Sequence, residues 1–229
     1  MNAATKRLPM LGLGVFTAVV IAAVPVWSDL IPDGKDLGHN YVGAGKCMVC
    51  HKKKLMGNQF ATWKRGPHYQ AYSTLQNETS IAIAKERGLV VAPSEAPECL
   101  TCHVTLQSVP SERMAYPVEL QNGVECESCH GPGKDYRKKT IMSDVKDARK
   151  NGLWDAGGDE GICLACHNSQ SPTFDPKRYT LPDGSTAGFA FKEAKEKISH
   201  PIPADVRGKY LELEKIEKEK ERAAAARVN

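Results

Sequence analysis

The most apolar part of the chain is an uncharged run near its N-terminus, residues 8–27. Lys6 and Arg7 precede this run, and Ser28 and Asp29 follow it. A basic start followed by an apolar stretch is typical of an export signal, and the run is also long enough to span a bilayer. We therefore expect residues 1–28 to be a signal peptide or an N-terminal membrane anchor. Both alternatives place the rest of the chain outside the cytoplasmic membrane.

After this run, apolar residues recur in short helical patterns separated by Pro and Gly. The expected helices are residues 58–63, a segment from Pro67 through Tyr72 to Leu75, residues 80–87 before Gly88, and residues 189–198. Loops are expected where Pro and Gly cluster, at residues 92–94 and 131–133. No long amphipathic helix or alternating series of strands is present to build a large aliphatic core, and the hydrophobic content is 41%. We predict a mainly α fold of short helices and loops.

The expected organisation has three parts: residues 1–28, a domain over residues 29–204, and a charged helical tail over residues 205–229. The tail is rich in Glu and Lys, with Glu214 placed to pair with Lys218 one helical turn later. The formal net charge of +4 comes without a basic stripe interleaved with aromatic residues, so we expect no nucleic-acid partner.

All eight cysteines fall into four repeats of one pattern, Cys-x-x-Cys-His, and none is left over for a disulfide. The repeats are Cys47, Cys50 and His51; Cys99, Cys102 and His103; Cys126, Cys129 and His130; and Cys163, Cys166 and His167. In this pattern the two thiols attach one haem through thioether bonds, and the adjacent His binds the iron. Zinc sites also use paired cysteines, but they do not require a His after each second Cys. The sequence therefore predicts four covalently bound haem c groups, with porphyrin rings supplying the apolar core.

Seven histidines are present, and the four in the motifs leave His39, His68 and His200. A second His closes an iron as a six-coordinate site, which suits electron transfer. We predict that His68 and His200 are such distal ligands, and that His39 is either a third one or an ordinary exposed residue. At least one iron then takes another ligand, such as Met142, a water or a residue of a neighbouring subunit, or stays open.

Several stretches resemble one known family. Residues 123–133 read Gly-Val-Glu-Cys-Glu-Ser-Cys-His-Gly-Pro-Gly, and residues 63–68 read Trp-Lys-Arg-Gly-Pro-His. The first resembles the third haem site, and the second a distal-ligand segment, of the tetrahaem cytochrome c-554 family, electron carriers linked to hydroxylamine oxidation in ammonia oxidisers. Residues 99–104 and 189–200 resemble its second haem site and a segment that ends in another distal His.

The resemblance implies a mainly helical fold with stacked and perpendicular haem pairs. It also implies three haems with two His ligands and one five-coordinate haem, here the haem on His103. One departure prevents transfer of the whole ligand set: the family has a distal His about ten residues after the third motif, where this chain reads Lys138-Lys139-Thr140. His39 is present instead, upstream of the first motif.

The leading interpretation is electron transfer between redox partners, either other cytochromes or a quinol-linked or hydroxylamine-type oxidoreductase. Surface lysines would steer an acidic partner. Two alternatives stay open. An open iron could act on nitric oxide, hydroxylamine or nitrite as an enzyme, or the chain could form a homo-oligomeric filament in which His39 completes a neighbour's haem. The expected location is periplasmic or on the outer face of the cytoplasmic membrane, with an extracellular location as a further alternative.

Overall fold

The computed structural model describes residues 38–105, 107, 109–117, 119–200, 202–205, 215–216, 219–220 and 222–223. The expected signal or anchor over residues 1–28 and most of the expected tail over residues 205–229 lie outside the described residues. Among the residues that are described, no helix has both the length and the apolar character needed to cross a membrane.

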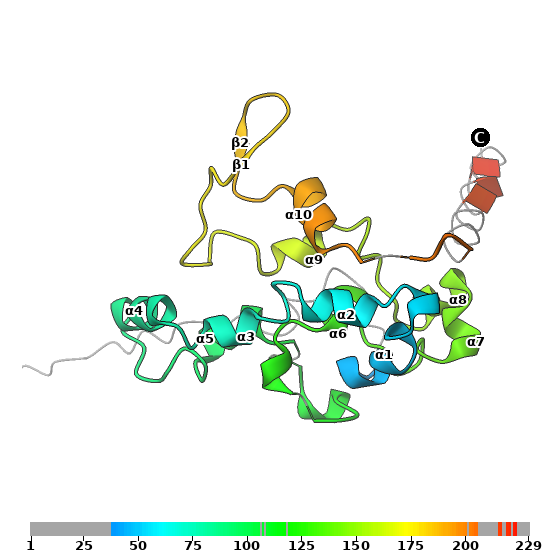
Figure 1. Ribbon diagram of the computed structural model, residues 1–229, viewed down its shortest axis with the longest axis horizontal. Coiled ribbons are helices and arrows are strands. Elements are labelled where there is room, and N and C mark those ends of the chain that lie inside the picture. The colour runs from blue at the N-terminus through cyan, green and yellow to red at the C-terminus, as the bar shows by residue number, and fades with distance from the viewer. Residues whose placement is uncertain are drawn as a thin grey trace, which may run out of the picture.

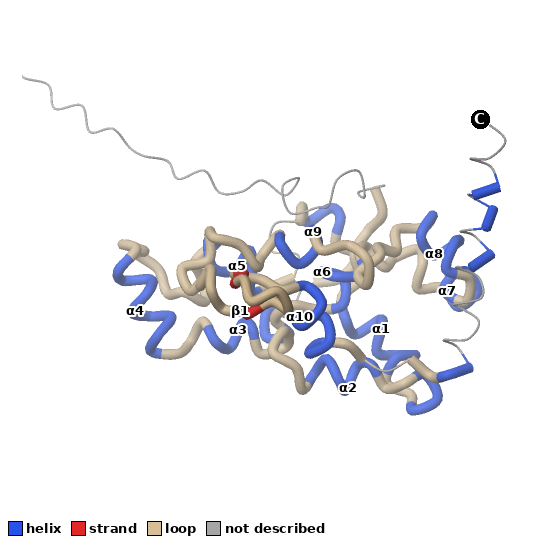
Figure 2. The backbone as a smooth tube through the Cα atoms, turned by 90° about the horizontal axis from the view of Figure 1, so that it is seen from above, coloured by secondary structure: helices blue, strands red, loops and turns tan. Residues whose placement is uncertain are grey.

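The mainly helical class predicted from the sequence is confirmed, because short helices joined by loops make up most of the described chain (Figure 1). The helices are α1 (Ala44–His51), η2 (Lys54–Met56), α2 (Gln59–Lys64), α3 (Ala71–Thr74), α4 (Glu78–Glu86), α5 (Pro97–His103), η3 (Ser111–Arg113), η4 (Leu120–Asn122), α6 (Cys126–His130), α7 (Lys139–Met142), α8 (Val145–Lys150), α9 (Gly161–Leu164) and α10 (Phe191–Ile198). Along the longest axis, α4 lies at one end and the α7–α8 pair at the other (Figures 1 and 2).

Local chemistry explains where several helices begin. The Asn77 side chain accepts a hydrogen bond from the backbone N–H of Ser80 (2.8 Å) and so caps α4. Asp144 caps α8 in the same way, and Pro97 occupies the first turn of α5, where no backbone N–H is needed. The helix expected over residues 80–87 is therefore present as α4, and Gly88 follows it with a φ of +71°.

The helix expected to start at Pro67 begins only at Ala71, so that boundary was wrong. Residues 67–70 form turns instead, and the His68 carbonyl accepts a hydrogen bond from Val124 N (2.9 Å), far away in the sequence. This long-range bond occupies a carbonyl next to the start of the expected helix, and sequence periodicity carries no sign of it.

A two-stranded antiparallel hairpin was not expected from the sequence. β1 (Tyr179–Thr180) pairs with β2 (Thr186–Ala187), with Tyr179 opposite Ala187 and Thr180 opposite Thr186. The turn contains Pro182, Asp183 and Gly184, a combination that favours tight turns and was available as a signal. The hairpin and the loops around it project from the rest of the molecule above α9 and α10 (Figure 1).

The aliphatic core is small and divided. One cluster consists of Leu75, Leu100 and Val104, against which Tyr72 and Leu120 pack. Within the described chain, the largest side chains that are fully buried are Glu127 and Pro132 rather than large aliphatic or aromatic residues. Such a core is too small to order this many loops by aliphatic packing alone.

Candidate haem-binding site

Each Cys-x-x-Cys-His motif begins on a helix. The first three motifs lie in α1, α5 and α6, and the fourth begins in α9 and continues into the following turn. Residues three apart share one face of a helix, so the two thiols of a motif point to the same side. Helical turns continue past the end of α9, because the N–H groups of Cys166 and His167 both donate to the Cys163 carbonyl, at 3.1 and 2.9 Å. All four motifs can therefore present two sulfurs to one porphyrin edge.

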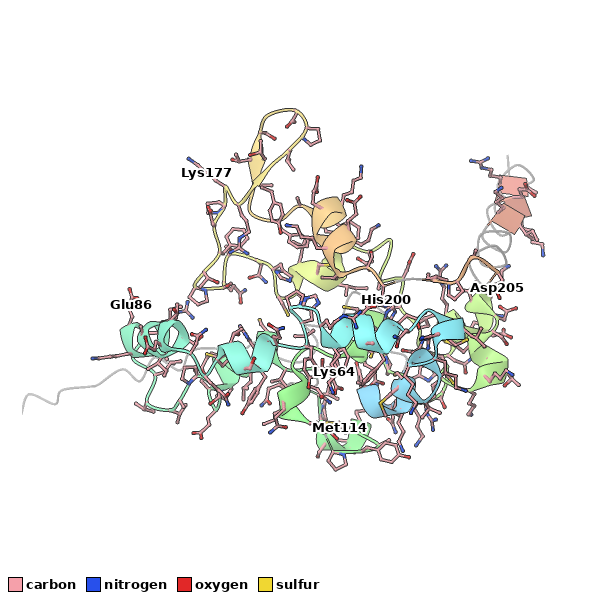
Figure 3. The ribbon with its side chains drawn as sticks, viewed as in Figure 1. Lys64, Glu86, Met114, Lys177, His200 and Asp205 are labelled. Carbon is pink, nitrogen blue, oxygen red and sulfur yellow. The ribbon has the colours of Figure 1, made fainter. Side chains whose placement is uncertain are left out.

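Two of the three other histidines lie opposite a motif histidine from a distant part of the chain. The ring centroids of His68 and His167 are 6.1 Å apart, and those of His200 and His130 are 5.9 Å apart. An imidazole nitrogen binds a first-row transition metal at about 2.0 Å, so two rings on opposite sides of one iron have centroids roughly 6 Å apart. Both separations fit one iron between the two rings. Figure 3 shows His200 in the middle of the molecule, below α10.

Burial keeps these four imidazoles neutral. Desolvation, followed by the proximity of His200 and His51, lowers the pKa of His130 to about 4. The pKa of His68 is lowered by burial and by His167, and the pKa values of His167 and His200 are lowered first by burial. A neutral imidazole has the free lone pair that a metal ligand needs. The two pairs are thus in the ligand form at neutral pH.

Two buried ring nitrogens support the fit of a further group in this region. Trp154 Nε1 and His200 Nδ1 have no hydrogen-bond partner in the described part of the chain. The Trp154 indole packs against the third motif, because a Cβ placed on Gly131 would lie 2.6 Å from Nε1. Buried donors are normally satisfied, and haem carries propionate groups that can accept such bonds. The residues present therefore fit a haem beside His130.

The other two motif histidines are oriented through Nδ1. His51 Nδ1 lies 3.2 Å from Gln59 Oε1, and His103 Nδ1 lies 2.7 Å from the Ala71 carbonyl and 3.3 Å from Thr74 Oγ1. A hydrogen bond from Nδ1 to an oxygen leaves Nε2 as the coordinating nitrogen, which is the usual arrangement around metal-bound histidines. In the described part of the chain, neither ring is in a paired ring contact like those of His167 and His130, although His51 lies near enough to lower the pKa values of His130 and His200.

His39 is placed differently from His68 and His200. Its Nδ1 lies 2.8 Å from Asp135 Oδ2, and its side chain is only 18% exposed. Its carbonyl accepts from the Arg113 side chain, and its ring packs so closely on Gly152 that a Cβ there would lie 3.0 Å from Cδ2. His39 is thus held beside the loop after the third motif, and it is not the ordinary exposed residue of the second expectation. Met142 lies on α7 with 38% of its side chain exposed.

Thiols from different motifs lie against one another. Cys47 is hydrogen-bonded to Cys126, and Cys166 to Cys102. The bond from Cys166 lowers the pKa of Cys102 to about 7 and raises that of Cys166. Burial, and then nearby Cys163, raises the pKa of Cys129 to about 11. These contacts connect the first motif to the third, the third to the fourth, and the fourth to the second.

Two carboxyl groups at the third motif, one just before it and one within it, were not predicted from the sequence as site residues. Glu127 accepts hydrogen bonds from the backbone N–H groups of Val42, Gly43 and Gly133, at 2.6–3.1 Å. Glu125 accepts from Ala44 N at the start of α1 and from Asn122 Nδ2. Together they tie α1, with the first motif, to α6, with the third. Two acids beside Cys126 were a visible signal, but the sequence does not show that they are buried.

Comparison with known proteins agrees with the family resemblance. Residues 46–131 match the family described as cytochrome c554 and c-prime. Cytochrome c-554 from Nitrosomonas europaea is 30% identical over 139 residues, which cover 56% of this chain and 57% of that protein, so the chain matches little more than half the length of this relative.

A solved structure of reduced cytochrome c554 from the same organism aligns with a TM-score of 0.41 and 22% identity, over 70% of this chain and 78% of that one. The match over residues 46–131 includes the first three motifs. Through this segment, the chain is similar to the cytochrome c554 and c-prime family.

Proposed function

We propose that this chain is an exported electron-transfer protein that carries a haem c at each of its four motifs. The observation that carries the proposal is the pair of imidazole couples, His68 with His167 and His130 with His200, at centroid separations of 6.1 and 5.9 Å. Bound haem supplies a one-electron ferric–ferrous couple. The side chains of the protein hold the iron ligands rigidly on both sides, so that little rearranges when an electron arrives or leaves.

The contacts between motifs support one order of transfer. Cys47 lies against Cys126, Cys129 near Cys163, and Cys166 against Cys102. The packing of the helices is consistent with this order, since α1 packs on α6 and α6 packs on α9. We infer a path from the first motif through the third and fourth to the second, or the reverse. Its redox partners are other proteins, and no side-chain acid, base or nucleophile is needed for this function.

A second function is favoured by one specific observation. His51 and His103 each have Nδ1 engaged, and in the described chain neither ring is in a paired ring contact like those of His130 and His167. An iron on either residue would then be open to a small nitrogen compound such as nitric oxide, hydroxylamine or nitrite. The two functions differ in turnover: steady consumption of one of these compounds by the purified protein favours the enzyme, and its absence favours the carrier.

The test uses protein purified after export. Its mass should exceed that of the polypeptide by four haem groups, and a mass equal to the bare polypeptide would overturn the proposal. In electron paramagnetic resonance spectra of the oxidised protein, His68→Ala and His200→Ala should each convert one low-spin iron to high spin. His39→Ala tests the third remaining histidine, whose Nδ1 is held by Asp135 so that Nε2 is left as a possible ligand. One more high-spin iron in this variant would make His39 a third distal ligand, and unchanged spin states would remove it from the ligand set.

A further inference from the structure

The first motif is surrounded by positive charge without any negative charge nearby in the sequence. Residues 44–65 contain no Asp or Glu. Their basic residues are Lys46, Lys52, Lys53, Lys54, Lys64 and Arg65. Five of them are exposed, and Lys46 is half-buried with its ammonium group 3.9 Å from the centre of the Tyr116 ring. In the part of the chain that the structure describes, none of the six forms an ion pair with a carboxylate.

Exposed apolar side chains lie among these charges. Val49 is 58% exposed within the motif itself, and Leu55 is 88% exposed in η2. The Cys50 thiol, which would carry one thioether bond, is exposed as well. We use the name basic surface for Val49, Cys50, Leu55 and the six basic residues. An apolar centre with a charged rim is the general anatomy of a protein–protein interface.

Further basic residues lie at the same end of the molecule, outside the basic surface. Asn40, just before α1, accepts a hydrogen bond from Lys134 N (3.0 Å), which joins this region to the segment before α7. Arg137, Lys138 and Lys139 are all exposed there. Figures 1 and 2 place α1 toward the α7–α8 end of the molecule, away from α4. Over residues 134–150, Lys and Arg outnumber Asp135, Asp144 and Asp147, and an excess of positive charge at one end raises the encounter rate with a partner of opposite charge.

We propose that the basic surface is the docking site for an acidic redox protein, and that electrons cross there to or from the haem of the first motif. The proposal rests on the proposed electron-transfer function. Charge complementarity identifies the partner as acidic. Cys50 and Cys47 would hold a haem at this surface, which would supply the electron to be exchanged, so we identify the partner as a redox protein. So few exposed apolar residues among these charges suit brief contact and rapid release rather than a permanent complex.

The experiment measures the rate at which an acidic flavodoxin, fully reduced, reduces the oxidised holoprotein. In each encounter the anionic flavin hydroquinone loses one electron to become the neutral semiquinone, and that electron reduces one ferric iron to ferrous. For the unchanged protein, the second-order rate constant should fall about tenfold or more between low salt and 0.5 M salt. The variant Lys52→Gln, Lys53→Gln, Lys54→Gln should lose about tenfold at low salt and most of the salt dependence.

The matched control is Lys177→Gln, Lys192→Gln, Lys197→Gln, which removes the same charge from the hairpin region and α10. Figure 3 shows Lys177 on the projecting arm, well apart from Lys64. The control should change the rate less than about twofold, since distant rim charges contribute little to steering. Equal effects of the two triple variants would overturn the proposal. The proposal would also be overturned if the first triple variant kept its rate with flavodoxin but lost binding to vesicles of anionic phospholipid. The surface would then bind a membrane.

An electrode titration of each protein separates this proposal from the proposed function. If the unchanged protein shows no reducible haem, the electron-transfer function itself fails. If the first triple variant titrates like the unchanged protein while its rate with flavodoxin falls, the loss lies in docking, as expected. If its titration is normal and its rate is also unchanged, only the docking site is refuted.

Discussion

Glu127 links two motifs through its side chain. The residue is 1% exposed, and its carboxyl group accepts hydrogen bonds from backbone N–H groups before α1 and after α6. Desolvation dominates over these bonds and raises the pKa of Glu127 from 4.5 to about 7. Glu127 therefore connects the first and third motifs, and its contribution to the free energy of unfolding depends on pH.

This shift predicts a specific pH dependence of stability. The folded chain keeps the Glu127 proton up to about pH 7, while the unfolded chain loses it near pH 4.5. The stability contributed by this group is therefore largest at low pH and declines as the pH rises through that window. Chemical denaturation at pH 5 and pH 8 should show the unchanged protein losing stability relative to Glu127→Gln.

The control for this measurement is Glu98→Gln, on the exposed face of α5. That variant should follow the unchanged protein at both pH values. A Glu127→Gln variant with the same pH profile as the unchanged protein would contradict a raised pKa at this position.

At the scale of elements, the segment before the third motif fixes the segment that carries His68. Trp63 Nε1 donates to the Val124 carbonyl (2.8 Å), and Val124 N donates to the His68 carbonyl (2.9 Å). Gly123 has a φ of +61°, and a Cβ there would lie 2.6 Å from the His68 carbonyl oxygen. Only glycine allows this approach of two backbone segments. The position of a predicted distal ligand thus depends on a glycine 55 residues later in the sequence.

Gly123→Ala should displace the His68 turn. We expect a loss of about 1–2 kcal/mol from the positive φ and roughly 1–3 kcal/mol more from the overlap. The spectrum should show one additional high-spin iron. Gly88→Ala is the matched control, because Gly88 has a φ of +71° and no atom within 4 Å of its Cβ position. This control should lose only the stability that the positive φ accounts for, and its spectrum should match that of the unchanged protein. Identical spectra for the two variants would show that the position of His68 does not depend on this packing.

For the whole molecule, the scarcity of aliphatic core determines what holds the chain together. The buried hydrophobic residues are divided among small clusters, while long loops connect the helices. Porphyrin rings attached at four points would provide apolar surface shared by all of these segments. Folding and cofactor attachment are then expected to be coupled, as in other small proteins whose core is completed by a bound group.

Replacement of all eight cysteines by serine tests this coupling. The haem-free chain should lack a cooperative thermal transition and the near-ultraviolet circular dichroism of packed aromatic residues. The holoprotein is the comparison and should unfold in a sharp transition. A haem-free chain with a cooperative transition of similar enthalpy would show that the polypeptide core is sufficient.

The sequence by itself determined the mainly helical class, the four Cys-x-x-Cys-His motifs and the family resemblance, because these depend on local spacing and on residue chemistry. Helices α2, α4 and α10 lie close to their expected positions for the same reason. The start of α3 and the hairpin were not predicted. The first depends on the Val124–His68 hydrogen bond, and the second on a Pro-Asp-Gly turn within an otherwise irregular segment.

Only the tertiary structure decided which parts of the chain meet. It brings His68 to His167 and His200 to His130, holds His39 on Asp135, and buries Glu127 between two motifs. It also arranges the motifs in an order, first, third, fourth and second, that differs from their order in the sequence. The physical reason is that short local patterns fix each helix, whereas pairing between helices depends on long-range packing and backbone hydrogen bonds that no local spacing encodes.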